Sequence, residues 1–283
     1  MSLPEHQTGT VASGDVELFY RRFGAPGATP ILIVHGLSYF SYDWIPIADT
    51  LAADREVVAM DMRGFGDSTW SPSQSYGVPD FAGDIVTLLD HLGWDSVNLM
   101  GHSMGGRNST WCAAENPDRM ASLILCDYSP QNAPEGSQRV TKTVAGVPDA
   151  FATVDDALEY FGKSRDLAAD DPYRIRMEAY LKKTDAGYIV KRDTFFRERF
   201  RATLEGKGGG HGPDMWAKLA EVRCPTLVVR GSRSDMFAAE NVQRVKDTNK
   251  NITLVEVDGG HDVGGDAPDA LVAEVWGFLN GKP

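Results

Sequence analysis

A serine with a glycine two residues away on either side is the first residue whose surroundings could support chemistry. Ser103 lies in Gly101-His102-Ser103-Met104-Gly105, directly after the apolar run 96–100 and directly before a helical pattern. This arrangement is typical of a sharp strand-to-helix turn that exposes a nucleophile, where the glycines let the strand and the helix approach closely. A chance match in a loop would lack both flanking elements, so we expect Ser103 to attack a carbonyl carbon.

A nucleophilic serine needs hydrogen-bond donors for the negative charge that develops on the attacked carbonyl oxygen. The helix that follows Ser103 presents free backbone N–H groups, and that of Met104 is the natural first donor. The second donor should come from the loop after the strand that ends at His35-Gly36, and we expect it to be the N–H of Leu37. His35 itself suits shaping that loop rather than direct chemistry.

The general base should follow the last strand of the chain. Residues 252–257 predict that strand, and Asp258-Gly259-Gly260-His261 then carries a histidine on flexible glycines toward Ser103. The order serine, acid, histidine along the chain fits this kind of site. The other five histidines lie in a tail, a strand end, a surface-type helix, the nucleophile's turn and a glycine-rich stretch, and they are His6, His35, His91, His102 and His211.

Two aspartates could orient the imidazole of His261, because this role needs only a buried carboxylate that fixes the tautomer. Asp127 ends the predicted strand after the nucleophile's strand, and Asp235 follows the next one. The usual position on the later strand lies three residues beyond its glycine, which is Ser234 here, so Asp235 comes one residue late. This offset favours Asp127 and keeps Asp235 as the alternative acid. The aspartate that is not used would cap a helix or a loop.

The elements that must position these residues alternate between strands and helices. Strand patterns occupy residues 31–34, 55–61, 96–100, 123–127, 226–230 and 252–257, and helical patterns occupy residues 78–92, 108–115, 241–248 and 269–279. Strands separated by helices predict a mostly parallel sheet covered on both faces, which is an α/β fold. Residues 16–22 predict an antiparallel strand that leads into this sheet.

The alternation breaks after Asp127. Residues 128–215 carry helix-like charged and aromatic segments, and they end near the glycine-rich stretch 206–213. That stretch lacks the Gly-Lys-Ser/Thr ending of a phosphate loop, so we interpret it as a flexible connector. The sequence therefore predicts a core domain of residues 1–127 and 216–283, with a helical lid of residues 128–215 inserted in it. The segment from Asp61 to Ser68, with one arginine and two glycines, should join loops beneath the site.

The composition excludes several classes of function. A net charge of −12 over 283 residues argues against nucleic acid, because a phosphate-binding surface needs a basic patch. No apolar run approaches the roughly 18–20 residues that a membrane span requires, and residues 1–5 do not resemble a signal peptide, so we expect a cytoplasmic protein. The three cysteines show no metal-ligand spacing. We predict no metal and no cofactor. We expect a small-molecule substrate and neither nucleic acid nor a membrane as a partner, and the oligomeric state stays open.

These motifs together resemble the α/β-hydrolase superfamily, and the likeness extends over nearly the whole chain outside the predicted lid. A narrower likeness, to the amide-cleaving 2-(acetamidomethylene)succinate hydrolase family, rests on three segments, which are Gly101–Ser109, Asp127–Pro130 and Arg230-Gly231. The resemblance implies a serine hydrolase that cleaves an ester or an amide through an acyl-enzyme. In the narrower family the triad acid follows the earlier strand, which matches Asp127, whereas this sequence also offers Asp235.

The predicted lid could help to choose the substrate. Residues 128–215 hold 14 of the 28 lysines and arginines, balanced by 14 acidic residues. Some of these arginines could clamp a substrate carboxylate, or all could lie on solvated helix faces. Arg174 and Arg176 are the predicted contacts, and the wider set of candidates adds Arg197, Arg199 and Arg201.

Other functions stay open on this fold. A cofactor-independent dioxygenase would use a histidine–aspartate dyad without attack by serine, and a carbon–carbon bond hydrolase would cleave a dienoate product. A receptor-like module would bind a small molecule and turn it over poorly. Fold alone does not separate these functions from ester or amide hydrolysis.

Overall fold

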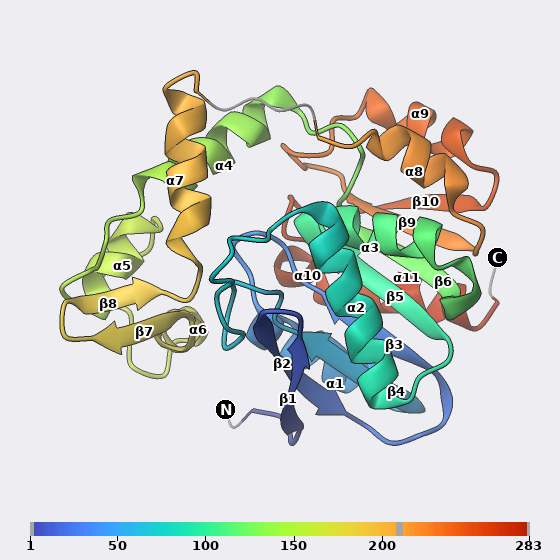
Figure 1. Ribbon diagram of the computed structural model, residues 1–283, viewed down its shortest axis with the longest axis horizontal. Coiled ribbons are helices and arrows are strands. Elements are labelled where there is room, and N and C mark those ends of the chain that lie inside the picture. Colours follow the sequence, from blue (N-terminus) through green and yellow to red (C-terminus); the bar gives the residue numbers. More distant parts are fainter. Residues whose placement is uncertain (1–2, 208–211, 282–283) are drawn as a thin grey trace.

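An eight-stranded sheet forms the centre of the computed structural model, which describes residues 3–207 and 212–281. Its spatial order is β1-β2-β4-β3-β5-β6-β9-β10 (Figure 1). Strands β4, β3, β5, β6, β9 and β10 run parallel. Strand β2 pairs antiparallel with β4, and β1 pairs antiparallel with β2 at the edge of the sheet. The strands are β1 (Gln7–Ser13), β2 (Val16–Phe23), β3 (Ala28–Val34), β4 (Arg55–Met60), β5 (Val97–His102), β6 (Met120–Cys126), β9 (Thr226–Gly231) and β10 (Ile252–Val257).

Both faces of the parallel strands are apolar, which explains why their sequences are continuous hydrophobic runs. In β3, Leu32 and Val34 belong to the core on one face, and Ile31 and Ile33 belong to the core on the other. Helices therefore have to cover both faces, and the predicted α/β fold with a mostly parallel sheet is confirmed.

Four helices, α2, α3, α8 and α9, pack on one face of the sheet, and α1, α10 and α11 pack on the other. The observed helix α3 begins earlier than the predicted pattern of residues 108–115, directly after Ser103. The bounds are α1 (Ile45–Leu51), α2 (Val78–Leu92), α3 (Met104–Glu115), α8 (Met215–Glu221), α9 (Asn241–Thr248), α10 (Val263–Asp266) and α11 (Pro268–Leu279), with short 3-10 turns at Ser41–Trp44 and Pro117–Arg119.

Residues 128–215 are here called the inserted segment, and residues 128–207 of it gather on one side of the sheet (Figure 1). The segment contains the helices α4 (Pro134–Gly146), α5 (Val154–Tyr160), α6 (Pro172–Tyr180) and α7 (Thr194–Leu204). Its own apolar cluster includes Phe151, Leu158 and Tyr180, and also Phe40 from the loop after β3. Of the predicted glycine-rich connector, residues 208–211 lie outside the described residues.

The sequence pattern predicts a helical inserted segment, but the segment also contains two short strands. A hairpin of β7 (Leu181–Thr184) and β8 (Gly187–Val190) pairs antiparallel between α6 and α7. The turn depends on Gly187, whose φ of 117° is a conformation that side chains with a Cβ rarely adopt. With only four residues per strand, the alternation was too short to stand out among the charged residues around it.

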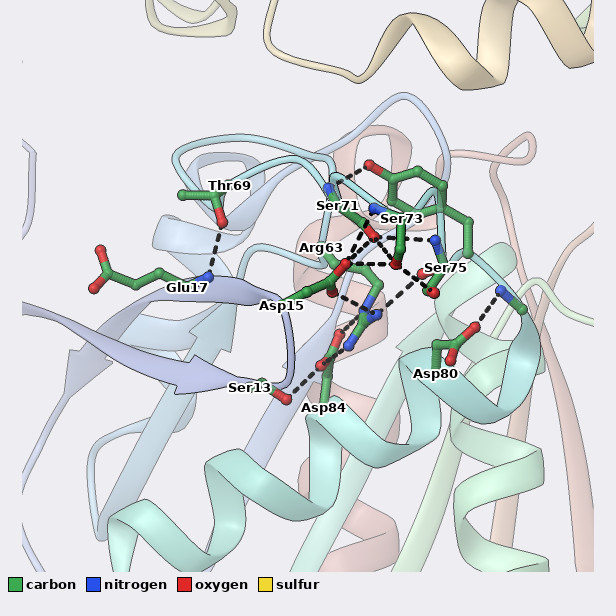
Figure 2. A network of polar contacts seen from close by, with 12 residues as sticks. Ser13, Asp15, Glu17, Arg63, Thr69, Ser71, Ser73, Ser75, Asp80 and Asp84 are labelled. Atoms are coloured by element: carbon green, nitrogen blue, oxygen red, sulfur yellow. Dashed lines mark hydrogen bonds and ion pairs between the residues drawn. The ribbon is translucent and has the colours of Figure 1, made fainter.

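A polar network fixes the loop that follows β4, as Figure 2 shows. Arg63 donates two hydrogen bonds of 2.6 Å to the buried carboxylate of Asp84 on α2. It also lies 3.7 Å from Asp15 in the β1–β2 turn, and the hydroxyls of Ser71 and Ser73 donate to that carboxylate at 2.6 Å. The loop from Asp61 to Ser68 therefore joins separate elements of the core through its arginine.

The same loop also holds the start of α7. The Asp193 N–H donates to the Gly64 oxygen at 2.8 Å, and the Tyr76 hydroxyl donates to the Asp193 carboxylate. Asp193 is the N-cap residue of α7, where its side chain accepts from the Phe195 N–H. The orientation of α7 is thus set by the core and not only by the inserted segment.

None of the helices in the described chain is both long and apolar enough to cross a membrane. The cytoplasmic location stays a prediction.

Candidate active site

Ser103 occupies a strained turn between β5 and α3. Its φ of 52° and ψ of −115° lie outside the regions that most residues with a side chain adopt. Its N–H donates to the Cys126 oxygen of β6 at 3.1 Å, and its carbonyl accepts from the Arg107 N–H at 3.0 Å. The strand and the helix hold the serine between them, so its side chain is positioned by rigid elements.

The turn is possible because the neighbouring glycines have no side chain. A Cβ on Gly101 would lie 2.6 Å from the Gly105 oxygen and equally close to the Ser109 hydroxyl. A Cβ on Gly105 would lie 2.2 Å from the Val34 oxygen of β3. The glycine positions in the motif therefore reflect close packing of α3 on β5 and β3.

A hydrogen-bonded chain connects Ser103, His261 and Asp127. His261 Nε2 lies 2.9 Å from Ser103 Oγ, and His261 Nδ1 lies 2.7 Å from Asp127 Oδ2. The carboxylate of Asp127 is fully buried, and 13% of the His261 side chain is exposed. With Nδ1–H donating to Asp127, Nε2 carries the lone pair that can accept the serine proton.

The carboxylate of Asp127 accepts two further hydrogen bonds from the loop after β9. The Gly231 N–H donates to Oδ1 at 2.9 Å, and the Ser234 hydroxyl donates to Oδ2 at 2.5 Å. Asp127 itself has a φ of 45°, at the point where the chain leaves β6. Ser234 stands where an acid on the later strand would be expected, and sequence reasoning gave it no role. The position of Ser234, three residues after Gly231, was the feature of the sequence that could have indicated its contact with the site.

Asp235 lies apart from this chain of hydrogen bonds. Its carboxylate accepts from Arg139 Nε at 2.5 Å and from Nη2 at 2.9 Å. These hydrogen bonds hold the pKa of Asp235 below its ordinary value. Of the two candidate acids, Asp127 is therefore hydrogen-bonded to His261, and Asp235 is hydrogen-bonded to Arg139 of α4.

The predicted oxyanion donors lie beside the serine. Leu37 and Met104 line the same cavity as Ser103, and Met104 is the first residue of α3, where backbone N–H groups have no partner within the helix. His35 shapes the loop that carries Leu37. Its Nδ1 donates to the Gly36 oxygen at 2.7 Å, and its Nε2 accepts from the Met62 N–H at 3.0 Å.

His102, next to the nucleophile, contacts the main chain of the candidate catalytic histidine, His261. His102 Nε2 lies 2.9 Å from the backbone oxygen of His261, to which it donates, and the two rings lie 4.9 Å apart. Burial, together with the neighbouring His261, lowers the pKa of His102 to about 4. A neutral His102 therefore holds the main chain at His261 without adding charge beside it.

The serine opens into a cavity of about 810 Å³ between the core and the inserted segment. This is within the range typical of sites for small organic molecules. Aromatic side chains form much of its wall, and they are Tyr39, Tyr76, Tyr128, Phe195, Phe196 and Phe200. Four arginines also line it, and they are Arg107, Arg139, Arg199 and Arg233.

The structure brings neither Arg174 nor Arg176 to this cavity. Arg174 pairs with Asp155 at 2.7 Å and with Glu178 at 3.3 Å, and it does not line the cavity of Ser103. Arg176 pairs with Asp43 at 2.6 Å and lines a neighbouring cavity of about 970 Å³. The sequence could show that the inserted segment is rich in arginine, but not which of these side chains already have acidic partners.

Comparison with known proteins identifies the family of this chain. The family model described as alpha/beta hydrolase fold matches residues 29–268. The chain belongs to the α/β-hydrolase family. It is 30% identical to a 3-hydroxybutyrate-oligomer hydrolase of Cupriavidus necator, over 86% of each chain. It is 25% identical to a 2-(acetamidomethylene)succinate hydrolase of Mesorhizobium japonicum, over 90% of this chain and 89% of the relative.

A solved structure titled E-2-(acetamidomethylene)succinate hydrolase superposes with a TM-score of 0.83 at 24% identity, over 98% of this chain and all of the other. At this identity the structural likeness shows the fold. The family model and the two relatives confirm the resemblance to hydrolases of this type, and this α/β-hydrolase is an enzyme whose relatives are named for hydrolysis.

Burial of His35 makes a prediction about stability. Burial lowers the pKa of His35 to about 4 from 6.5. Between these pH values the unfolded chain binds a proton at His35 that the folded chain does not. The contribution of His35 to the free energy of unfolding should therefore fall as the pH falls through this window, by up to about 1.4 kcal/mol per pH unit. Urea denaturation from pH 7 to pH 4 measures this slope.

His35→Gln removes the titrating group. The free energy of unfolding of this variant should therefore change less steeply with pH than that of the wild type, even if the variant is less stable at every pH. Asp61 acts in the opposite direction in both proteins, because burial raises its pKa to about 6. Equal slopes in the two proteins would show that His35 does not resist protonation.

Proposed function

We propose that this α/β-hydrolase cleaves an ester or amide bond of a small organic substrate through an acyl-enzyme at Ser103. The observation that carries the proposal is the chain of hydrogen bonds from Asp127 through His261 to Ser103, which ends in the cavity. Two of the relatives support it, since their names describe a hydrolase of 3-hydroxybutyrate oligomers and a hydrolase of 2-(acetamidomethylene)succinate.

In the first half of the reaction Ser103 Oγ attacks the carbonyl carbon, and His261 Nε2 takes the hydroxyl proton. The negative charge on the carbonyl oxygen is stabilised by the N–H groups of Met104 and Leu37. His261 then donates the proton to the leaving alcohol or amine as the bond breaks. Asp127 accepts from Nδ1–H throughout and stabilises the imidazolium.

In the second half a water molecule replaces the leaving group. His261 removes a proton from the water while its oxygen attacks the ester of Ser103. His261 then returns that proton to Ser103 Oγ as the acyl bond breaks, and the acid product leaves. We assign the inserted segment the role of a lid, because its residues Phe195, Phe196 and Phe200 line the cavity into which Ser103 opens, where apolar side chains would help to keep water from the bound substrate.

The nucleophile can be tested with a fluorophosphonate probe. The wild-type protein should form a covalent adduct at Ser103, identified by mass spectrometry of its peptides. Ser103→Ala should form none, should keep its fold, and should hydrolyse its best ester substrate roughly 10⁴–10⁶ times more slowly. A screen of small 4-nitrophenyl esters and anilides supplies that substrate.

Full hydrolytic activity in folded Ser103→Ala would contradict acyl transfer through this serine. Oxygen uptake with a quinolone by the same variant would instead support the dioxygenase reading.

The acid can be tested by two matched substitutions, Asp127→Asn and Asp235→Asn. Asparagine keeps the size of the side chain but donates toward Nδ1, which favours the wrong imidazole tautomer. Asp127→Asn should therefore lower kcat by about 10⁴-fold. Asp235→Asn weakens only the contact with Arg139, so we expect a far smaller loss. The reverse ranking, measured on folded proteins, would assign the role to Asp235.

A further inference from the structure

The four arginines that line the cavity differ in whether an acidic side chain neutralises them. Arg139 is paired with Asp235, and Arg233 is paired with Asp258. Within residues 3–207 and 212–281, neither Arg107 nor Arg199 has a carboxylate within 4 Å. The remaining residues, Met1, Ser2, 208–211, Lys282 and Pro283, carry no acidic side chain.

Arg107 is the more unusual of the two, because it is partly buried. In the described chain its side chain makes one hydrogen bond, from Nε to Asn108 Oδ1 at 3.2 Å. Burial, together with the charge of Arg199, holds the pKa of the Arg107 guanidinium below its ordinary value. Buried cations in proteins are normally paired, since an unpaired one loses hydration without compensation. A bound anion would therefore stabilise the guanidinium group of Arg107 at this position.

Tyr128 adds a polar group without a hydrogen-bond partner beside Arg107. The residue is 6% exposed and lines the cavity, and its hydroxyl has no hydrogen-bond partner in the described part of the chain. Burial raises the pKa of Tyr128 and the charge of Arg107 opposes this, so the hydroxyl keeps its proton at neutral pH. The region around Arg107 thus offers donors in excess of acceptors.

The two arginines come from different parts of the molecule. Arg107 lies one helical turn after Ser103 on α3, so its position relative to the nucleophile is fixed by the helix. Arg199 lies on α7 of the inserted segment, whose start is held by Asp193. An anion between the two guanidinium groups would contact both sides of the cavity while the serine acts on another part of the same molecule.

We propose that Arg107 and Arg199 form a subsite for a carboxylate, so that the substrate is an ester or amide that also carries a free carboxylate. This inference rests on the proposed function of Ser103. Guanidinium groups bind carboxylates through paired, charge-assisted hydrogen bonds, which fix orientation as well as charge. The apolar wall of Phe195, Phe196 and Phe200 suits the carbon skeleton of an organic acid.

The test compares two esters that differ in one charge. Mono-4-nitrophenyl succinate carries a carboxylate, and methyl 4-nitrophenyl succinate is its neutral counterpart. The wild type should prefer the acidic ester in kcat/KM. Arg107→Gln and Arg199→Gln should each lower kcat/KM for the acidic ester by about 10- to 100-fold, mainly through KM, because each removes a charge-assisted hydrogen bond. The neutral ester should change little.

Arg174→Gln is the matched control, since it removes the same charge from the inserted segment at a site away from the cavity. Its kcat/KM should equal that of the wild type for both esters. Because Arg199 is exposed, Arg199→Gln should fold even where Arg107→Gln does not. In addition, free succinate should inhibit hydrolysis of the neutral ester competitively, and this inhibition should weaken in Arg199→Gln.

Hydrolysis of both esters by the wild type, with equal effects of Arg199→Gln on the two, would overturn the carboxylate subsite and leave the serine hydrolase intact. No hydrolysis of either ester, together with no fluorophosphonate adduct at Ser103, would instead overturn the proposed function itself. An acidic-ester preference that Arg199→Gln removes supports both.

Discussion

The buried carboxylate of Asp127 is the interaction on which the site depends. It accepts from Ser234 and Gly231 of the loop after β9, and from His261 of the loop after β10. Three segments that are far apart in the sequence thus meet at the end of β6. A carboxylate with no exposed surface is stable only with such donors, and the same donors fix where the histidine can lie.

The parallel sheet explains why these segments can meet. The carboxyl ends of β5, β6, β9 and β10 lie along one edge, and each supplies a residue of the site or the loop that carries it. The turn at Ser103 has a strained φ of 52°, which the packing of β5 and α3 maintains. The inserted segment then contributes part of the cavity wall, and the hydrogen bond from the Asp193 N–H to the Gly64 oxygen joins that segment to the loop after β4.

Sequence patterns predicted most of the sheet, because buried parallel strands are continuous apolar runs and the turn at Ser103 has fixed glycine positions. They could not predict the short hairpin of β7 and β8, where four residues per strand give too little alternation. They also predicted the wrong arginines, Arg174 and Arg176, as contacts of the substrate. Whether an arginine is neutralised depends on acids from other elements, such as Asp43 for Arg176, and this pairing is a property of tertiary structure. Asp127 and Asp235 were both plausible acids until their partners in space were known.

The most direct test of the central claim moves the carboxylate from β6 to the loop after β9. Ser234 Oγ lies 2.5 Å from Asp127 Oδ2, so an aspartate at position 234 should reach His261 as well. The measurement is kcat/KM of Asp127→Asn, with and without the second substitution Ser234→Asp, on the best ester. We predict that the double variant recovers a large part of the activity that Asp127→Asn loses. A folded double variant no faster than the single one, or a single variant as fast as the wild type, would contradict the account.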